Sequence, residues 1–93
     1  MRYQSKYSGN DMAPLWLAGD LIEFEDVDPA AIEPGRDYYV ETATGATFKR
    51  CVHVDAARII VGSVTEPAEC WAVERSRIVR VGRAVGVLAV RDG

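Results

Sequence analysis

The run from Ile78 to Val90 constrains the fold of this chain more than any other segment. Valines occupy the alternate positions 79, 81, 85 and 87 of this run. An apolar residue at every second position is typical of a β-strand with one buried face. Gly82, Ala84 and Gly86 fall on the other face, where small residues permit a bend or the close approach of another backbone. The run therefore predicts one long strand.

Two further pairs of apolar runs are separated by turn signals. Residues 37–42 and 46–54 are rich in Tyr, Val, Thr and Phe, and Gly45 between them predicts a hairpin turn with a positive φ. Residues 58–64 and 70–73 form the second pair. Strands therefore account for most of the chain.

Helix signals are confined to two short turns, near residues 13–18 and 29–32. In the second turn Asp28 is placed to cap and Pro29 to take the first helical position. About seven short strands with very little helix are typical of an all-β sandwich or barrel. We therefore expect one all-β domain over residues 1–93, with coiled, partly barrel-like sheets.

Length and composition limit the classes of function. Ninety-three residues allow one compact domain, and 48% hydrophobic with 27% charged residues is an ordinary globular composition. The net charge of -3, with no helix-turn-helix pattern, argues against direct contact with nucleic acid. No run approaches the roughly 20 apolar residues that span a membrane. We expect a cytoplasmic chain without a DNA-binding head, in which Cys51 and Cys70 stay free.

Five short blocks lie in a fixed order along nearly the whole chain. They are Tyr-Ser-Gly-Asn-Asp-Met-Ala-Pro from Tyr7, Ala-Gly-Asp-Leu-Ile from Ala18, Ile-Glu-Pro-Gly from Ile32, Thr-Phe-Lys-Arg from Thr47, and Gly-Arg-Ala-Val-Gly-Val-Leu from Gly82. In this order and spacing they resemble the self-cleaving serine peptidase domain of LexA and phage repressors. The same blocks resemble the mutagenesis accessory subunits of translesion DNA polymerases.

The resemblance implies a LexA/signal peptidase-like fold with a Ser-Lys catalytic pair and no cofactor or metal. In that family the first block carries the nucleophilic serine, and the Phe-Lys-Arg or Val-Lys-Arg block carries a lysine that acts as general base. Lys49 matches the lysine, whereas Asp11 occupies the serine position. The chain therefore departs from the family at the nucleophile itself.

This departure predicts a silent catalytic site. A serine attacks an amide only when a base takes its proton, and lysine serves as that base only where desolvation lowers its pKa. Asp11 offers no hydroxyl, and its carboxylate beside Lys49 raises the pKa of the lysine. We therefore expect Asp11 and Lys49 to form an ion pair in a vacated cleft.

The resulting hypothesis is a catalytically inactive, LexA-like regulatory module of a repressor-type transcriptional regulator. Family members dimerise through this domain, and the strand of residues 81–90 is suited to pairing across a two-fold axis. A homodimer would raise operator affinity by linking two DNA-reading heads. Two alternatives stay open: an active or engineered-inactive Ser-Lys peptidase of the SOS-response type, and a stand-alone accessory subunit of a translesion polymerase.

Several other polar residues are alternative candidates for catalytic groups. An acid dyad of Asp11 and Asp20 is disfavoured, because the Gly-Asp acid of the family is a recurrent loop residue. Four serines lie outside the serine position of the motif and without a recognisable base; they are Ser5, Ser8, Ser63 and Ser76. Strand-end or turn hydroxyl groups are the simpler interpretation of all four.

Three further features have a functional and a structural interpretation. Cys51 and His53 share one face of a regular strand, but two ligands make weak evidence for a metal, and a buried thiol with an exposed imidazole is favoured. The acidic residues between Glu23 and Asp28 are interpreted as a solvated face rather than a steering patch. Trp16 and Trp71 are expected to cap the core rather than anchor an interface.

Overall fold

The computed structural model describes residues 2–9, 12–13, 15–65 and 69–89 of the chain, and its regular structure there is seven strands and two 3-10 turns. The two turns are η1 (Pro29–Ala31) and η2 (Arg75–Arg77). The strands are β1 (Arg2–Lys6), β2 (Leu21–Asp26), β3 (Asp37–Thr42), β4 (Gly45–Val54), β5 (Arg58–Gly62), β6 (Cys70–Glu74) and β7 (Ile78–Ala89). The all-β prediction is confirmed.

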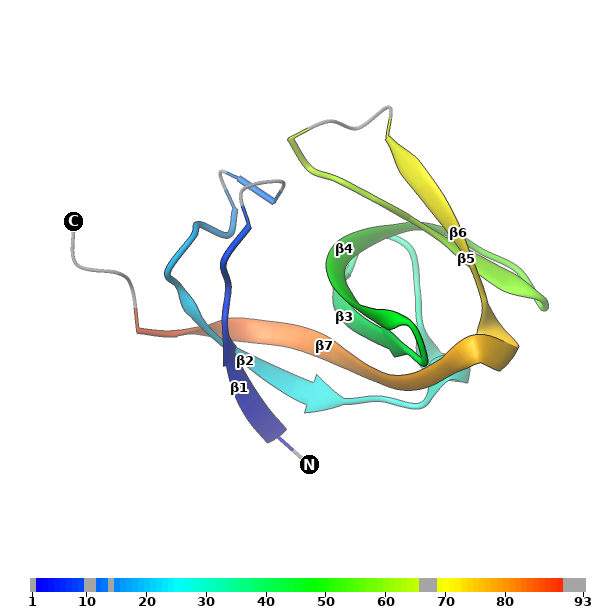
Figure 1. Cartoon of the computed structure of the whole chain (residues 1–93), viewed down its shortest axis with the longest axis horizontal. Helices are drawn as coiled ribbons and strands as arrows, with labels where there is room; N and C mark the ends of the chain where they lie inside the picture. Colours follow the sequence, from blue (N-terminus) through cyan, green and yellow to red (C-terminus); the bar gives the residue numbers. More distant parts are fainter. Residues whose placement is uncertain (1, 10–11, 14, 66–68, 90–93) are drawn as a thin grey trace.

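All seven strands belong to one antiparallel sheet with the order β1-β2-β7-β3-β4-β5-β6. The sheet curls strongly but is not closed into a barrel, so β1 and β6 are its two edges. Figure 1 shows β3 to β6 curling around one side of the molecule and β1 and β2 on the other, with β7 reaching both. Among the described residues no helix is long and apolar enough to cross a membrane.

The local turn predictions are also confirmed. Thr42 pairs with Gly45 at the end of the β3–β4 hairpin, and Gly45 has a φ of 149°. Asp28 accepts a hydrogen bond of 2.8 Å from the amide of Ala30, which caps η1 as expected. Near the other expected turn, that of residues 13–18, the amide of Trp16 donates to the carbonyl of Met12.

Apolar side chains form two buried clusters on opposite faces of the sheet. The first, named here the aliphatic cluster, consists of Ile32, Tyr38, Val40, Cys51, Ile59, Val61 and Val81. The second, the aromatic cluster, has Met12, Ile22, Phe24 and Phe48 at its centre and Tyr3, Tyr7, Trp16, Tyr39, Val64 and Ala84 around them. Successive residues of a strand face opposite sides, which is why Tyr38 and Tyr39 belong to different clusters.

Strand β7 is long, as predicted, but three bulges break the predicted alternation. Thr42 pairs with Ile78 while Glu41 pairs with Arg80, and similar shifts against β2 leave three residues of β7 without a cross-strand partner: Val79, Val85 and Leu88. Each bulge changes which face the following residues present. Val81 therefore enters the aliphatic cluster while Val85 and Val87 stay exposed.

The small residue Gly82 is needed for close packing. A Cβ atom at this position would collide with the phenol ring of Tyr3 and lie 3.2 Å from the Cβ of Phe24. Tyr3 is the side chain by which β1 packs on the sheet, stacking on Phe24 with ring centroids 5.5 Å apart. The sequence predicted the close approach of another backbone, whereas the group that lies against Gly82 is the side chain of Tyr3.

The two edges of β7 differ along its length. Residues 78–83 pair with β3 on one edge, and residues 82–89 pair with β2 on the other. Among the described residues, the edge from Ala84 to Ala89 that faces away from β2 has no ladder partner. Only this half of the predicted pairing strand is open. Gly82 and Arg83 are paired on both sides, and Val81 pairs with Val40 of β3 and accepts a hydrogen bond from the amide of Val27. Val90 lies outside the described residues.

The acidic residues of β2 are neutralised by arginines from the strands beside it. Glu23 pairs with Arg2 of β1 at 3.1 Å. Glu25 pairs with Arg83 at 3.2 Å and Asp26 with Arg80 at 3.1 Å, both from β7. These are partly exposed cross-strand ion pairs, so the stretch is not a free acidic patch for a cationic partner.

Candidate functional site

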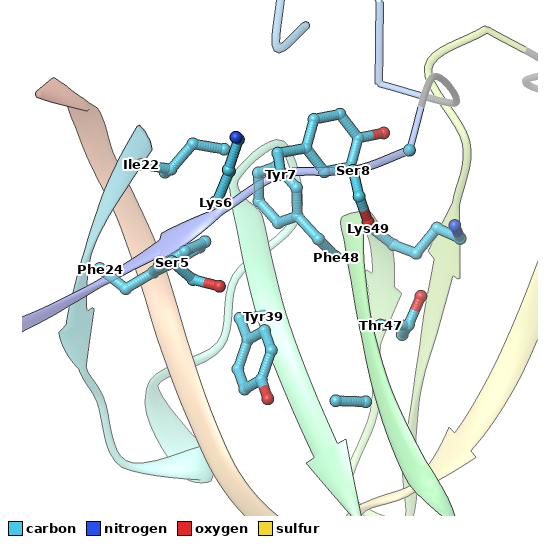
Figure 2. A pocket seen from close by; sticks show the side chains of 12 residues that line it. Ser5, Lys6, Tyr7, Ser8, Ile22, Phe24, Tyr39, Thr47, Phe48 and Lys49 are labelled. Carbon is cyan, nitrogen blue, oxygen red and sulfur yellow. The ribbon is translucent and has the colours of Figure 1, made fainter. Parts of the chain in front are cut away.

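An open groove of about 530 Å³ lies over the aromatic cluster. One wall is the end of β1 and the segment after it, and the other wall is the first half of β4 (Figure 2). Its lining residues are Ser5, Lys6, Tyr7, Ser8, Gly9, Ile22, Phe24, Tyr39, Ala46, Thr47, Phe48 and Lys49. Three of the five motif blocks therefore contribute to one groove: the block from Tyr7, the block from Ala18 through its last residue Ile22, and the block from Thr47.

Phe48 organises the floor of this groove. Its ring meets Tyr7 and Phe24 edge-on at centroid distances of 5.4 Å each, and Trp16 at 5.6 Å. The hydroxyl of Tyr7 accepts a hydrogen bond of 3.2 Å from the amide of Met12, whose side chain is fully buried. These contacts fix both ends of the first motif block against β4.

Lys49 extends from β4 away from the rings of Tyr7 and Phe48 (Figure 2). Burial lowers the pKa of its ammonium group, and the negative charge of Glu69 opposes that shift. Its Nζ lies 5.2 Å from the centroid of the Trp71 ring. A half-buried lysine with a lowered pKa is the environment that a lysine general base requires.

Asp11 lies outside the described residues, so its predicted ion pair with Lys49 stays a prediction. Its described neighbours lie on the same side of the molecule as Lys49. Gly9 lines the groove together with Lys49, and Met12 is buried in the aromatic cluster beneath it.

Asp20 is a structural residue of its loop. It is only 4% exposed, and its Oδ2 accepts a hydrogen bond of 2.9 Å from the amide of Leu17. Asp20 does not line the groove. This position agrees with the loop role assigned from the sequence and offers no support for an acid dyad.

The serines divide into two groups that the sequence did not distinguish. Ser5 and Ser8 line the groove with Lys49, whereas Ser63 is buried and Ser76 lies in η2. The sequence favours a structural role for Ser5 and Ser8, because both stand outside the nucleophile position of the motif. One feature of the sequence could have indicated that Ser5 and Ser8 lie near the site. They flank Tyr7, the first residue of the motif block that carries the nucleophile position.

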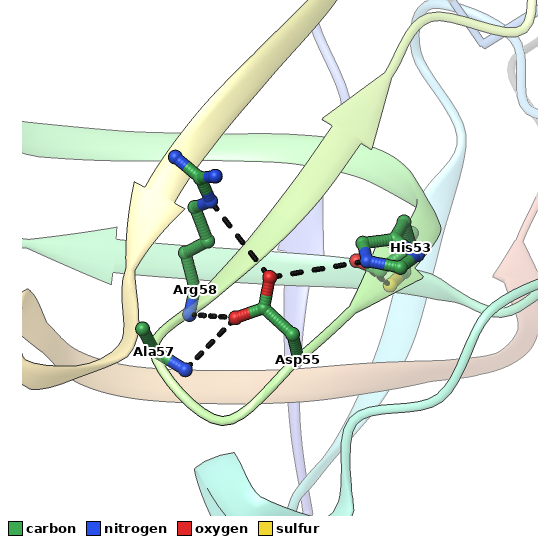
Figure 3. Close-up of polar contacts among 5 residues, drawn as sticks. His53, Asp55, Ala57 and Arg58 are labelled. Carbon is green, nitrogen blue, oxygen red and sulfur yellow. Dashed lines mark hydrogen bonds and ion pairs between the residues drawn. The ribbon is translucent and has the colours of Figure 1, made fainter.

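The face predicted to carry both Cys51 and His53 does not exist, because a bulge at Val52 shifts the register. Cys51 pairs with Val61 while His53 pairs with Ile60. Cys51 is therefore buried and its Sγ donates to the carbonyl of His53 at 3.6 Å. The imidazole points outward toward Asp55 at 3.9 Å (Figure 3). Burial raises the pKa of the Cys51 thiol, which keeps it in its neutral form.

The favoured interpretation of this pair, a buried thiol and an exposed imidazole, is thus confirmed. Among the described residues no group of three or more His, Cys, Asp or Glu side chains is arranged to hold a metal ion. Both cysteines are free, with Cys51 buried and Cys70 exposed.

The two tryptophans have different roles. Trp16 packs on the aromatic cluster as predicted, and its Nε1 donates to Asp37 at 2.7 Å. Asp37 also binds the guanidinium of Arg50 at 2.8 Å, so the loop is tied to β3 and β4. The prediction for Trp71 is wrong: its side chain belongs to neither cluster and is 46% exposed beside Lys49.

Comparison of the chain with protein-family models, with curated proteins and with solved structures finds no match in any of the three. The likeness to repressor peptidases therefore rests on the motif blocks alone, and the function that it implies is treated below as a proposal.

Proposed function

We propose that this chain is a non-proteolytic, LexA-like regulatory module that acts by self-association within a repressor-type regulator. The observation that carries the proposal is the groove that Lys49 lines together with Tyr7, Ser8 and Gly9, the segment leading to Asp11. The lysine has the desolvated environment of a general base. The residue at the matching nucleophile position has a carboxylate in place of a hydroxyl. Together, the groove, the environment of Lys49 and the carboxylate of Asp11 support a catalytic cleft that is retained in shape but has lost its peptidase activity.

The open edge of β7 supports the self-association part of the proposal. Residues 84–89 present an unpaired strand edge, and the aliphatic side chains of Val85, Val87 and Leu88 are 37%, 39% and 50% exposed. Unpaired strand edges with exposed aliphatic residues are ready to pair with another chain. Pairing of two copies about a two-fold axis would cover both features at once.

Reactivity toward a fluorophosphonate tests the catalytic part. The unmodified chain is expected to remain unlabelled. Asp11→Ser supplies a hydroxyl and removes the carboxylate that keeps Lys49 protonated, so this variant should label slowly and faster at alkaline pH, where lysine is neutral. Adding Lys49→Ala to it should abolish the labelling. Mass spectrometry of the intact protein gives the readout.

Labelling of the unmodified chain would contradict the proposal, as would its cleavage of a repressor-linker peptide. The matched variants Ser5→Ala and Ser8→Ala would then identify the nucleophile, because these are the two serines that line the groove. Loss of the activity in Lys49→Ala would establish that the lysine serves as its base.

Sedimentation equilibrium tests self-association. We expect a homodimer at micromolar concentrations, and Leu88→Lys should produce a monomer because it places a charge at the open edge. Val79→Lys is the matched control: Val79 is 66% exposed on the same strand but outside the proposed edge, so this variant should remain dimeric. An unmodified chain that is monomeric at high concentration would contradict this part of the proposal.

A further inference from the structure

Trp71 is a large apolar side chain that the core does not use. It lies on β6, at the edge of the sheet, and almost half of its surface is exposed. Its ring is nevertheless placed against one particular group, the ammonium of Lys49, whose Nζ is 5.2 Å from the ring centroid. Within about 6 Å the negative face of an indole attracts a cation, and Trp is the strongest of the aromatic residues in this respect.

The sheet brings the two residues together across three strands. Cys51 of β4, Val61 of β5 and Trp71 of β6 form one cross-strand row. Lys49 lies two positions before Cys51 on β4, so it shares the face of that row. Its long side chain reaches diagonally past the end of β5, which stops at Gly62, and meets the indole. The contact is a product of strand register rather than of a flexible loop.

We propose that Trp71 is a positioning residue for Lys49, holding its ammonium group at the end of the groove nearest β6. The contact itself does not depend on the proposed function of the chain. Its consequence for reactivity rests on that function, since it makes Trp71 a second contributor to the silence of the site, besides the substitution at residue 11. A general base must be neutral, and a cation–π contact favours the charged form.

Other groups around Lys49 also affect the equilibrium between its ammonium and its neutral amine. Burial favours the neutral amine, and the carboxylate of Glu69 favours the ammonium. Lys6 and the phenol of Tyr7 stand on the opposite wall of the same groove. Asp11 is the remaining charge expected there. The contribution of the ring must therefore be measured with these groups left in place.

An NMR titration of Lys49 in two Trp71 variants measures the contribution of the aromatic ring to the pKa of the lysine. Trp71→Phe retains an aromatic face, whereas Trp71→Leu retains an apolar side chain without one. The pKa of Lys49 should be lower in the Leu variant than in the Phe variant by about half a unit. This follows from a cation–π energy of roughly 0.5–1 kcal/mol and 1.36 kcal/mol per pKa unit. Equal pKa values in two folded variants would overturn the proposal.

Labelling in the Asp11→Ser background separates this inference from the proposed function. The pH at which fluorophosphonate labelling reaches half its maximum rate should be lower with Trp71→Leu than with Trp71→Phe, by the same half unit. If the NMR titration shows the shift but the labelling profile does not, Lys49 is not the base and the proposed function fails while the positioning role stands. If the titration shows no shift, the positioning role fails whatever the labelling does.

Discussion

The aliphatic and aromatic clusters lie against the same central strands, and both are buried at their centres. Four rings of the aromatic cluster line the groove, so the aromatic cluster is called open here and the aliphatic cluster closed. Cys51 and Ile59 are fully buried because the curl of β3 to β6 encloses them. The aromatic cluster depends instead on β1 and on the loop from Met12 to Asp20 for its cover, and several of its rings line the open groove. The curled sheet, with Ile32 from the segment after η1, thus encloses the aliphatic cluster, while the rings of the aromatic cluster lie along the groove.

The aliphatic cluster lies beside two residues that line the groove. Tyr38 and Val40, both in the aliphatic cluster, are the cross-strand partners of Lys49 and Thr47 on the groove wall. Directly opposite residues of two strands share one face, so Thr47 and Lys49 lie on the face of the aliphatic cluster while Phe48 between them lies on the other. The groove therefore takes residues from both faces of β4. Sites built on strands in this way are better fixed than sites on loops.

The largest expected effect concerns the closed cluster. Ile59→Ala should lower the free energy of unfolding by about 2–5 kcal/mol, because an enclosed site cannot collapse around the missing methyl groups. Urea denaturation followed by circular dichroism measures this loss. Val79→Ala, on an exposed bulge of β7, should change stability by no more than about 0.5 kcal/mol. Similar losses in the two variants would show that the aliphatic cluster is not the closed core.

Sequence patterns predicted the elements of the closed half well. The β3–β4 hairpin followed from β-forming residues on either side of Gly45, and η1 followed from Asp28 and Pro29, because both signals are local. The length of β7 also followed from its valines. Which face each valine takes did not follow, because bulges depend on the pairing partners of a strand and not on its own sequence.

The open half was harder to predict. Strand β1 has one partly buried side chain, Tyr3, so it carries no alternating pattern that marks a strand. The motif blocks predicted a cleft shared by Asp11 and Lys49, and the contact of Asp11 stays a prediction. Tyr7, Ser8 and Gly9 of the same block line the groove with Lys49. The motif blocks gave no indication of Trp71, because its contact with Lys49 arises from the register of three successive strands.

The smaller effect concerns the open cluster, at the point where β1 is attached. Gly82→Ala places a methyl group where the ring of Tyr3 lies, so the ring must move or β7 must shift. Overpacking of this kind costs about 1–3 kcal/mol. Gly86→Ala is the matched control on the same strand, since a Cβ there meets nothing within 4 Å, and it should be neutral or slightly stabilising.

Hydrogen exchange shows whether the damage stays in the open half. In Gly82→Ala the amides of β1 should lose protection while those of β5 keep theirs, because Tyr3 holds β1 and takes no part in the aliphatic cluster. The double variant Tyr3→Ala with Gly82→Ala should cost less than the sum of the two single changes, since the obstacle is already removed. Full additivity, or equal loss of protection in β1 and β5, would mean that the two clusters form one cooperative core and that their apparent independence is wrong.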